Sequence, residues 1–191
     1  LAKIKTDTKE IGNTFPSVAH CSVAGYNILL FDFPPLWRFM EAPMTREQTA
    51  EITQKQRSFF LTGATLPVEY RIRALQRLKQ SIIDNENDIA AALRSDLGKS
   101  AEESYMCETG MVLSEISYML KHIRSFAKDQ VVATPLAQFA SRSYRKPTPY
   151  GVTLIMSPWN YPLLLTLDPL VDALAAGNTV VIKPSAYSPA T

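Results

Sequence analysis

The pattern of apolar and polar positions divides the chain into a helical part and a later part that contains strands. Apolar side chains recur at the spacing of an amphipathic helix in four segments, residues 45–62, 67–84, 86–93 and 101–128. Two short β-branched runs, 152–156 and 179–182, follow near the C-terminus and are bounded by turn residues. Runs of this kind are typical of buried strands. The pattern therefore predicts helices first and the opening of an α/β domain afterwards.

Residues at the ends of the first three segments support the predicted helix boundaries. Thr45 and Gln48 have the spacing of a capping box, in which each side chain satisfies a free backbone N–H at the start of a helix. Pro67 suits the first turn of the second helix, because that turn does not need its missing N–H. Gly63 and Gly98 can adopt the left-handed conformation that ends a helix.

The segment 101–128 predicts a long amphipathic rod. Its apolar positions near helical spacing are Tyr105, Val112, Ile116, Leu120, Ile123 and Phe126. The polar side chains between them include Glu108, Glu115 and Lys121. Beyond the rod, residues 141–146 alternate in the manner of a strand, so an exposed or edge strand is expected there.

The two apolar runs near the C-terminus, with the segment between them, predict a βαβ unit. Two parallel strands joined by a crossover helix place their carboxyl ends at one edge of the sheet, where ligands bind in such folds. Trp159, Asn160 and Lys183 lie at these predicted strand ends. The sequence therefore indicates a candidate ligand site at this edge.

The crossover segment carries three positions that shape a helix. Pro162 suits its first turn, and Gly177 suits its C-terminal end. Pro169 removes one backbone hydrogen bond and clashes with the carbonyl four residues earlier. A kink or a break is therefore expected near Asp168.

The first 39 residues show no sustained period and are interpreted as an irregular leader. This leader is either an artefact of upstream translation, with the true start at Met40 or Met44, or a structured extension. The expected divisions are a leader at 1–44, a helical N-terminal part at 45–140 and the start of an α/β domain at 141–191. The chain looks cut at both ends, because it begins without a methionine and stops shortly after a predicted buried strand.

Composition and charge exclude several classes of function. The 191 residues include 20 Lys and Arg against 18 Asp and Glu, a formal charge of +2, which gives no large field for nucleic acid or a membrane surface. The two cysteines are too few and too isolated for a disulfide framework or a zinc site. No apolar run reaches the length of a membrane span. We therefore expect a globular, cytoplasmic protein without a metal site.

Three short motifs carry a resemblance to a known family. The sequence reads Pro-Trp-Asn-Tyr-Pro at 158–162, Ala-Ala-Gly-Asn at 175–178 and Lys-Pro-Ser at 183–185. In this order and spacing the motifs resemble the aldehyde dehydrogenase superfamily, and the resemblance covers about residues 45–191. Trp-Asn-Tyr-Pro and the helix at 105–116 look most like the class 3, or fatty aldehyde, branch. The resemblance implies that 141–191 begins an NAD(P)-binding, Rossmann-like parallel sheet, incomplete here, although no Gly-x-Gly-x-x-Gly follows its first strand.

The resemblance assigns roles to residues at the strand ends. Asn160 matches the asparagine whose side-chain amide helps to form the oxyanion hole, where one such donor contributes about 3 kcal/mol. Lys183 matches the lysine that binds the adenosine ribose hydroxyls of NAD or NADP. The other expected cofactor-binding residues, which act mostly by backbone and shape, are Met156, Ser157, Pro158, Trp159 and Ser185. Without the resemblance, Asn160 is interpreted as a turn or capping residue and Lys183 as a solvated lysine.

One position departs from the family pattern. Many NAD-preferring relatives have a glutamate three residues after this lysine, which binds the ribose hydroxyls, and this chain has Ala186 there. A carboxylate would repel a 2′-phosphate, so its absence leaves NADP admissible. We therefore expect appreciable use of NADP.

The resemblance implies oxidation of a small-molecule aldehyde to a carboxylic acid through a thiohemiacetal and a thioester, by a homodimer when full length. The catalytic cysteine and glutamate of the family lie beyond Thr191 in this numbering, so the segment alone is expected to be inactive. Neither Cys21 nor Cys107 replaces that cysteine, because an unactivated thiol is a weak nucleophile. The alternatives are a non-catalytic α/β binding module and a related CoA-acylating or acyl-phosphate-reducing enzyme.

Overall fold

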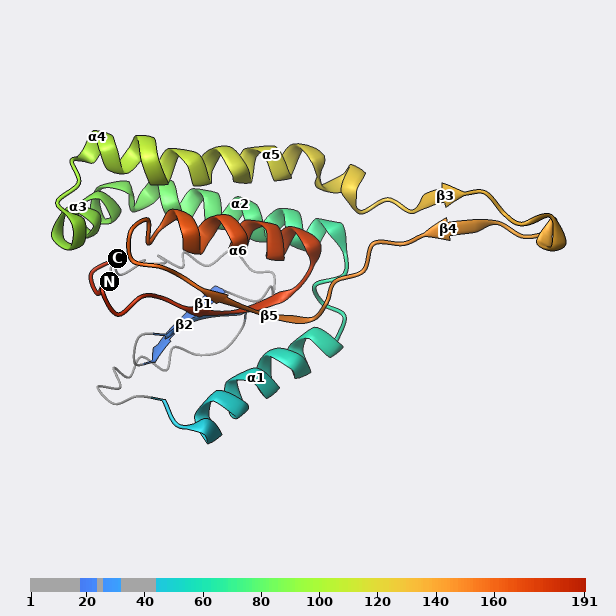
Figure 1. Cartoon of the computed structure of the whole chain (residues 1–191), viewed down its shortest axis with the longest axis horizontal. Helices are drawn as coiled ribbons and strands as arrows, with labels where there is room; N and C mark the ends of the chain where they lie inside the picture. The colour runs from blue at the N-terminus through green and yellow to red at the C-terminus, as the bar shows by residue number, and fades with distance from the viewer. Residues whose placement is uncertain (1–17, 24–25, 32–43) are drawn as a thin grey trace, which may run out of the picture.

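A computed structural model describes residues 18–23, 26–31 and 44–191, with side chains from residue 44 onward (Figure 1). The elements in chain order are β1 (Val18–Val23), β2 (Tyr26–Phe31), α1 (Arg46–Leu61), α2 (Val68–Asp84), α3 (Glu86–Leu97), α4 (Ala101–Ser104), the π-helical turn η1 (Tyr105–Thr109), α5 (Gly110–Phe126), β3 (Gln130–Val132), the 3-10 turn η2 (Leu136–Gln138), β4 (Ser143–Arg145), β5 (Val152–Met156), α6 (Leu164–Ala176) and β6 (Thr179–Lys183).

The main sheet has the strand order β1-β2-β6-β5. β5 and β6 pair in parallel from Val152 opposite Thr179 to Met156 opposite Lys183, and α6 connects them, so the predicted βαβ unit is confirmed. β1 and β2 form an antiparallel hairpin, and β2 pairs with β6. The sequence analysis did not predict this hairpin, because the first 39 residues show no sustained period; of its two strands, only β2 also pairs with a strand far along the chain. The rest of the predicted leader, 1–17, 24–25 and 32–43, lies outside the described residues.

Helices cover both faces of the parallel pair. α1 contacts β5 and β6 on one side, and α6 contacts them on the other, with α2 and α5 packed against α6 (Figure 1). Parallel strands bury both faces, so this layering is what their apolar sequences require. The apolar residues with the least exposure are Leu75, Leu93, Val112, Ile116, Ile123, Leu170, Val171 and Val180. The expected fold class, an incomplete α/β domain, is confirmed.

The predicted helix ends agree with the structure in most details. The Thr45 hydroxyl accepts the Gln48 N–H at 3.3 Å and the Gln48 side chain accepts the Thr45 N–H at 2.8 Å, which completes the capping box of α1. Gly98 ends α3 with φ 72°, in the left-handed region. Pro67 is the N-cap of α2 and not its first helical residue, because its ψ of 131° is extended. α3 spans Glu86–Leu97, so its apolar pattern at 86–93 is extended by one turn to the end predicted from Gly98.

The predicted rod at 101–128 is present as α4, η1 and α5. In its first turns, however, the buried side chains differ from those predicted. The backbone N–H of Gly110 bonds to the carbonyl of Tyr105, five residues earlier, which makes one π turn. This wider turn shifts the phase of the apolar stripe, so Tyr105 is 47% exposed and Glu108 is 0% exposed. The inward placement of Tyr105 was therefore wrong. Phe126, at the opposite end, is also half exposed.

The strand expected at 141–146 is part of a projecting hairpin. β4 pairs with β3 in an antiparallel register, and the two strands extend away from the helices and the main sheet (Figure 1). Val131, Leu136 and Phe139 on this arm are largely exposed. The expectation of an exposed strand is confirmed, with the shorter bounds of β4.

α6 runs without a break from Leu164 to Ala176 with Pro169 inside it, so of the predicted kink or break near Asp168 the break is wrong and the kink stays a prediction. Pro169 is exposed, which lets water solvate the carbonyl that lost its backbone partner. α6 begins at Leu164 with Leu163 as its N-cap, so Pro162 precedes the helix and does not lie in its first turn as predicted, although the N–H of Leu165 bonds to the carbonyl of Tyr161 at 3.0 Å. Gly177 ends the helix with φ 92°.

Candidate functional site

The carboxyl ends of β5 and β6 form one edge of the molecule. Met156 and Lys183 are paired at the end of the parallel register, and the N–H of Ser157 donates to the carbonyl of Lys183 at 3.0 Å. The turn 157–163 leaves β5 at this edge and enters α6. The structure therefore brings together the strand ends on which the sequence placed its candidate site.

Asn160 lies in the middle of this turn and is exposed. Its main-chain carbonyl accepts a hydrogen bond, whereas no hydrogen bond to its side-chain amide occurs among residues 44–191. An amide group carries two N–H donors and one acceptor oxygen. The side chain is therefore available to a ligand at the edge, and its backbone is held in place.

Two carbonyl groups of the turn are held by side chains from other parts of the chain. The Ser188 hydroxyl donates to the Trp159 carbonyl at 3.1 Å. The Lys99 ammonium donates to the Asn160 carbonyl at 3.3 Å and lies 4.1 Å from the centroid of the Tyr161 ring. A cation over an aromatic face is attracted by the ring quadrupole. The turn is therefore fixed from the α3–α4 connection and from the segment after β6.

A buried ion pair lies beside the turn and forms hydrogen bonds to it. Lys99 Nζ and Glu108 Oε1 are 2.5 Å apart, with side-chain exposures of 10 and 0%. Glu108 Oε2 accepts the N–H groups of Leu163 and Leu164 at 2.8 and 3.0 Å. These N–H groups belong to the start of α6, where no carbonyl in the helix can accept them and where the helix dipole favours an anion. Every oxygen of this buried carboxylate is therefore paired.

The sequence analysis missed Glu108, although a signal was present. Glu108 is three residues after Tyr105 and four before Val112, so it falls on the apolar stripe of the rod. A charged residue on an apolar stripe indicates a buried partner. Lys99, which follows the glycine that ends α3, had no comparable signal.

The remaining predicted site residues differ in how open they are. Met156 and Trp159 are 67 and 55% exposed, and Pro158 is exposed as well. The hydroxyls of Ser157 and Thr166 lie 2.6 Å apart, so Ser157 is engaged within the turn. The Ser185 hydroxyl accepts the Tyr187 N–H at 3.2 Å. Lys183 is partly buried, with Nζ 3.5 Å from the Pro184 carbonyl oxygen.

This set of groups fits one end of a nucleotide. An ammonium group at the end of β6 can donate to ribose hydroxyls, and the exposed Met156 and Trp159 side chains offer an apolar surface beside it. In open α/β sheets ligands bind beyond the carboxyl ends of the strands. The donor set therefore suits the expected NAD or NADP, although the roles of the individual residues stay predictions.

The segment after β6 is tied back to α3. The Asp96 carboxylate accepts the N–H of Ala190 at 3.0 Å and both the N–H and the hydroxyl of Thr191 at 2.8 Å. Together with the bond from Ser188 to the turn, these contacts fix the path of residues 184–191 below the site.

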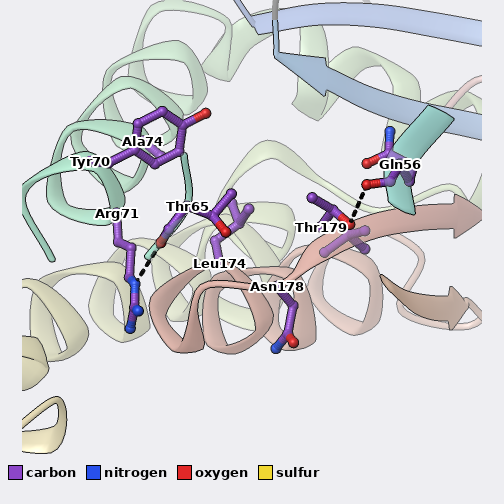
Figure 2. A pocket seen from close by; sticks show the side chains of 9 residues that line it. Gln56, Thr65, Tyr70, Arg71, Ala74, Leu174, Asn178 and Thr179 are labelled. Atoms are coloured by element: carbon purple, nitrogen blue, oxygen red, sulfur yellow. Dashed lines mark hydrogen bonds between the residues drawn. The ribbon is translucent and has the colours of Figure 1, made fainter. Parts of the chain in front are cut away.

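A small cavity of about 10 Å³ lies at the opposite end of the strands, around Thr179, the first residue of β6 (Figure 2). Arg71 from α2 lines it, with Nε donating to the Thr65 carbonyl at 2.9 Å and Nη1 to the Ala175 carbonyl at 3.2 Å. Burial lowers the pKa of Arg71. The cavity has about the smallest volume that can hold one water molecule. It is therefore a packing gap where α1, α2 and α6 meet and no ligand site.

Cys107 lies on the π turn, partly buried, as a free thiol. Among the described residues no three His, Cys, Asp or Glu side chains gather as metal ligands would. In the same part of the chain, every helix is too short or too polar to cross a bilayer.

Comparison with known proteins identifies the family. Residues 39–191 match the sequence profile of the Aldehyde dehydrogenase family, and the chain belongs to that family. The resemblance found in the sequence motifs is thereby confirmed.

The most similar curated relatives include members of the class 3 branch. The chain is 43% identical over 140 residues to "Aldehyde dehydrogenase, dimeric NADP-preferring" of Canis lupus familiaris, which covers 73% of the chain and 31% of that protein. It is 42% identical over 133 residues to "4,4'-diaponeurosporen-aldehyde dehydrogenase" of Staphylococcus aureus, with 70% and 29% covered. The chain thus spans about 30% of the length of the curated relatives it matches.

Solved structures share the fold. The structure described as "Substrate bound state of Staphylococcus Aureus AldH" superposes with a TM-score of 0.71 at 39% identity, over 77% of this chain and 32% of that chain. The helices, the arm and the βαβ unit therefore correspond to part of a larger aldehyde dehydrogenase fold.

Proposed function

We propose that this chain is the oxyanion-binding part of an aldehyde dehydrogenase that oxidises an aldehyde to a carboxylic acid with NAD or NADP. The observation that carries the proposal is the open side-chain amide of Asn160 on a turn whose carbonyls and following N–H groups are held by Ser188, Lys99 and Glu108. Membership of the family supports the reaction class.

In this proposal Asn160 donates a hydrogen bond to the oxygen of the aldehyde. When a thiolate adds to the carbonyl carbon, the carbonyl oxygen gains negative charge, and a donor fixed beforehand stabilises that charge without reorganising. The anchored backbone matters, because a side chain on a mobile turn would have to be ordered during the reaction. In this proposal the thiolate and the general base belong to the remaining length of the relatives, of which the chain spans about 30%.

The cofactor part of the proposal rests on the edge formed by β5 and β6. Lys183 is proposed to donate to the ribose hydroxyls, and Met156, Ser157, Pro158, Trp159 and Ser185 are proposed to shape the surface beside it. NAD or NADP, when bound, supplies the hydride acceptor. Ala186 is exposed and presents no carboxylate, which is compatible with a 2′-phosphate.

The oligomeric state and location are part of the same proposal. The name of the canine relative describes a dimer that prefers NADP, which supports a homodimer and use of NADP by this protein. A cytoplasmic location remains our expectation from the cysteine content and the absence of a long apolar run in the sequence.

Replacement of Asn160 in the full-length enzyme tests the oxyanion role. Loss of one such donor lowers kcat by about a hundredfold to a thousandfold, so we expect this for Asn160→Ala, with thermal unfolding unchanged. Asn87→Ala, at an exposed position of α3, is the matched control. An Asn160→Ala enzyme with the kcat of the wild type would overturn the proposal.

The cofactor is tested by steady-state rates with NAD and with NADP. The wild type is expected to turn over with NADP, and Ala186→Glu is expected to raise KM for NADP while leaving KM for NAD nearly unchanged, because the new carboxylate repels the 2′-phosphate. A wild type with no NADP-dependent rate would reject this part of the proposal.

A further inference from the structure

The Lys99–Glu108 ion pair has hydrogen bonds to the turn that carries Asn160 and to the helix that follows it. We propose that this pair is a positioning device for the oxyanion donor, so that the reactivity of the enzyme depends on Glu108 and Lys99 although neither touches the substrate. The inference rests on the proposed role of Asn160 and names the residues that set its geometry.

Glu108 fixes where α6 begins. Its Oε2 accepts the N–H groups of Leu163 and Leu164, three and four residues after Asn160. A carboxylate that binds two adjacent N–H groups holds both their distance and their direction, since hydrogen bonds weaken steeply as they bend. The helix start, and with it the C-terminal side of the turn, is therefore held on the rod formed by η1 and α5.

Lys99 fixes the residue that carries the amide. Its Nζ donates both to Glu108 Oε1 at 2.5 Å and to the main-chain carbonyl of Asn160 at 3.3 Å. The same ammonium stacks on the ring of Tyr161, the next residue. Rotation of the peptide group between Asn160 and Tyr161 would break these contacts, so the direction of the Asn160 side chain is coupled to the ion pair.

The location of the pair favours a positioning role over a purely stabilising one. Replacing a buried ion pair by well-packed apolar side chains is often neutral or even stabilising, because desolvation costs as much as the attraction returns. Here the hydrogen bonds of both partners, other than the one between them, go to residues 160, 163 and 164. A chain that needed only a stable core could fill this place with apolar side chains.

The π turn provides the position from which Glu108 reaches α6. Glu108 and Thr109 are both buried on η1, and the turn closes through the Gly110 N–H to the Tyr105 carbonyl. A Cβ at Gly110 would lie 2.8 Å from that carbonyl oxygen, so only glycine fits without displacement. π turns of this kind are frequent at functional sites.

A double-mutant cycle in the full-length enzyme tests the coupling. Glu108→Gln keeps the shape of the side chain but turns an N–H₂ group toward either the Lys99 ammonium or the α6 N–H groups, where donor meets donor. We expect kcat to fall roughly tenfold to a hundredfold, as for a small misplacement of a catalytic group. In the Asn160→Ala background the same change is expected to cost less than about threefold, because the group it positions is gone.

Controls separate positioning from stability. Glu115→Gln, two turns further along the same helix, is the matched control and should leave kcat unchanged in both backgrounds. KM for the cofactor should not change with Glu108→Gln. Lys99→Arg keeps the charge and the fold but changes the reach of the donor, so it should repeat the kcat loss and its disappearance in Asn160→Ala if Glu108→Gln yields too little folded enzyme.

The outcomes distinguish the two proposals. Equal losses of kcat from Glu108→Gln with and without Asn160, or an unchanged kcat for both Glu108→Gln and Lys99→Arg, would overturn the positioning role while the role of Asn160 stands. An unchanged kcat for Asn160→Ala alone would reject the oxyanion proposal, and the positioning role would fall with it.

Discussion

Two carboxylates on the rod formed by α4, η1 and α5 face α6. One is paired with N–H groups and a cation, and the other lies near two further carboxylates. Glu108 lies against the first N–H groups of α6 and beside Lys99, with no exposed surface. Glu115, two turns later, lies near Asp168 and Asp172 in the body of α6. Burial raises the pKa of Glu115, and the charges of Asp172 and Asp168 raise it further.

The difference follows from the place along α6 that each carboxylate meets. The N-terminus of a helix has unpaired N–H groups and a partial positive charge, whereas the middle of a helix has all its N–H groups bonded internally. A carboxylate can therefore be buried at the helix start when a cation completes its partners, whereas Glu115, in the middle, is only partly buried. The interface of η1 and α5 with α6 thus combines a well-paired charge, Glu108, and a repulsive cluster formed by Glu115, Asp168 and Asp172.

The largest effect is expected from removing the cation of the buried pair. Lys99→Met leaves Glu108 buried without its counter-charge, which typically costs about 3–5 kcal/mol of folding free energy. Lys55→Met is the matched control, because Lys55 pairs with Glu51 at 2.7 Å on the surface of α1. That loss should stay within about 0.5 kcal/mol. Chemical denaturation of the two full-length variants measures both values, and equal losses would contradict the distinction between buried and exposed pairs.

A smaller effect is expected from closing the space in the π turn. Gly→Ala inside a helix normally stabilises a protein by about 1 kcal/mol. At Gly110 the sign should reverse, because the new Cβ meets the Tyr105 carbonyl oxygen at 2.8 Å and its ring at 3.1 Å. We expect a loss of about 1–3 kcal/mol, the usual cost of overpacking, together with a fall in kcat.

Ser114→Ala, at an exposed position one turn further along α5, provides the comparison for Gly110→Ala. Its unfolding midpoint should be equal to or slightly above that of the wild type, since alanine is the better helix former. A Gly110→Ala enzyme that is more stable than the wild type would show that the π turn can relax without cost.

The smallest effect is expected in the repulsive cluster. Burial raises the pKa of Asp168, and burial together with the charge of Asp168 raises the pKa of Asp172. An acid with a raised pKa binds its proton more tightly in the folded state, so stability falls as the pH rises from the unfolded pKa to the folded one. Asp168→Asn should therefore be more stable than the wild type at pH 7, by less than about 1 kcal/mol.

This gain should vanish below the ordinary Asp pKa of about 3.9, where the wild-type cluster is protonated in both states. Thermal unfolding of Asp168→Asn and the wild type between about pH 3.5 and 7, at constant ionic strength, measures the difference in stability. Asp129→Asn, at an exposed position after α5, is the matched control and should show no such pH dependence. A gain for Asp168→Asn that is independent of pH would contradict the repulsion.

The sequence was informative where a local signal decided the structure. The capping box of Thr45 and Gln48, the left-handed glycines and the two apolar runs each act within a few residues, and α1, β5 and β6 appear where these signals predict them. The turn at Asn160 was also located, because proline and glycine mark both ends of α6. The roles of Asn160 and Lys183 came only from the resemblance and remain predictions.

The sequence was less informative where distant parts of the chain decide the structure. The pairing of β2 with β6 depends on long-range contacts that no short pattern contains. The exposure of Tyr105 follows from one π turn, and the continuity of α6 through Pro169 follows from its packing against β5, β6 and α5. Tertiary contacts overrode local preference at each of these places.

The hydrogen bonds between Asp96 and the residues after β6 constrain the length of this surface loop. Surface connections usually accept insertions, because lengthening a loop costs little entropy. The segment between Lys183 and Ala190 instead connects the end of β6 to the residue that bonds Asp96. Along this segment the Ser188 hydroxyl also has to reach the Trp159 carbonyl. We therefore expect insertions to be tolerated at the tip of the β3–β4 arm, which reaches away from the helices and the main sheet (Figure 1), and not between Lys183 and Ala190.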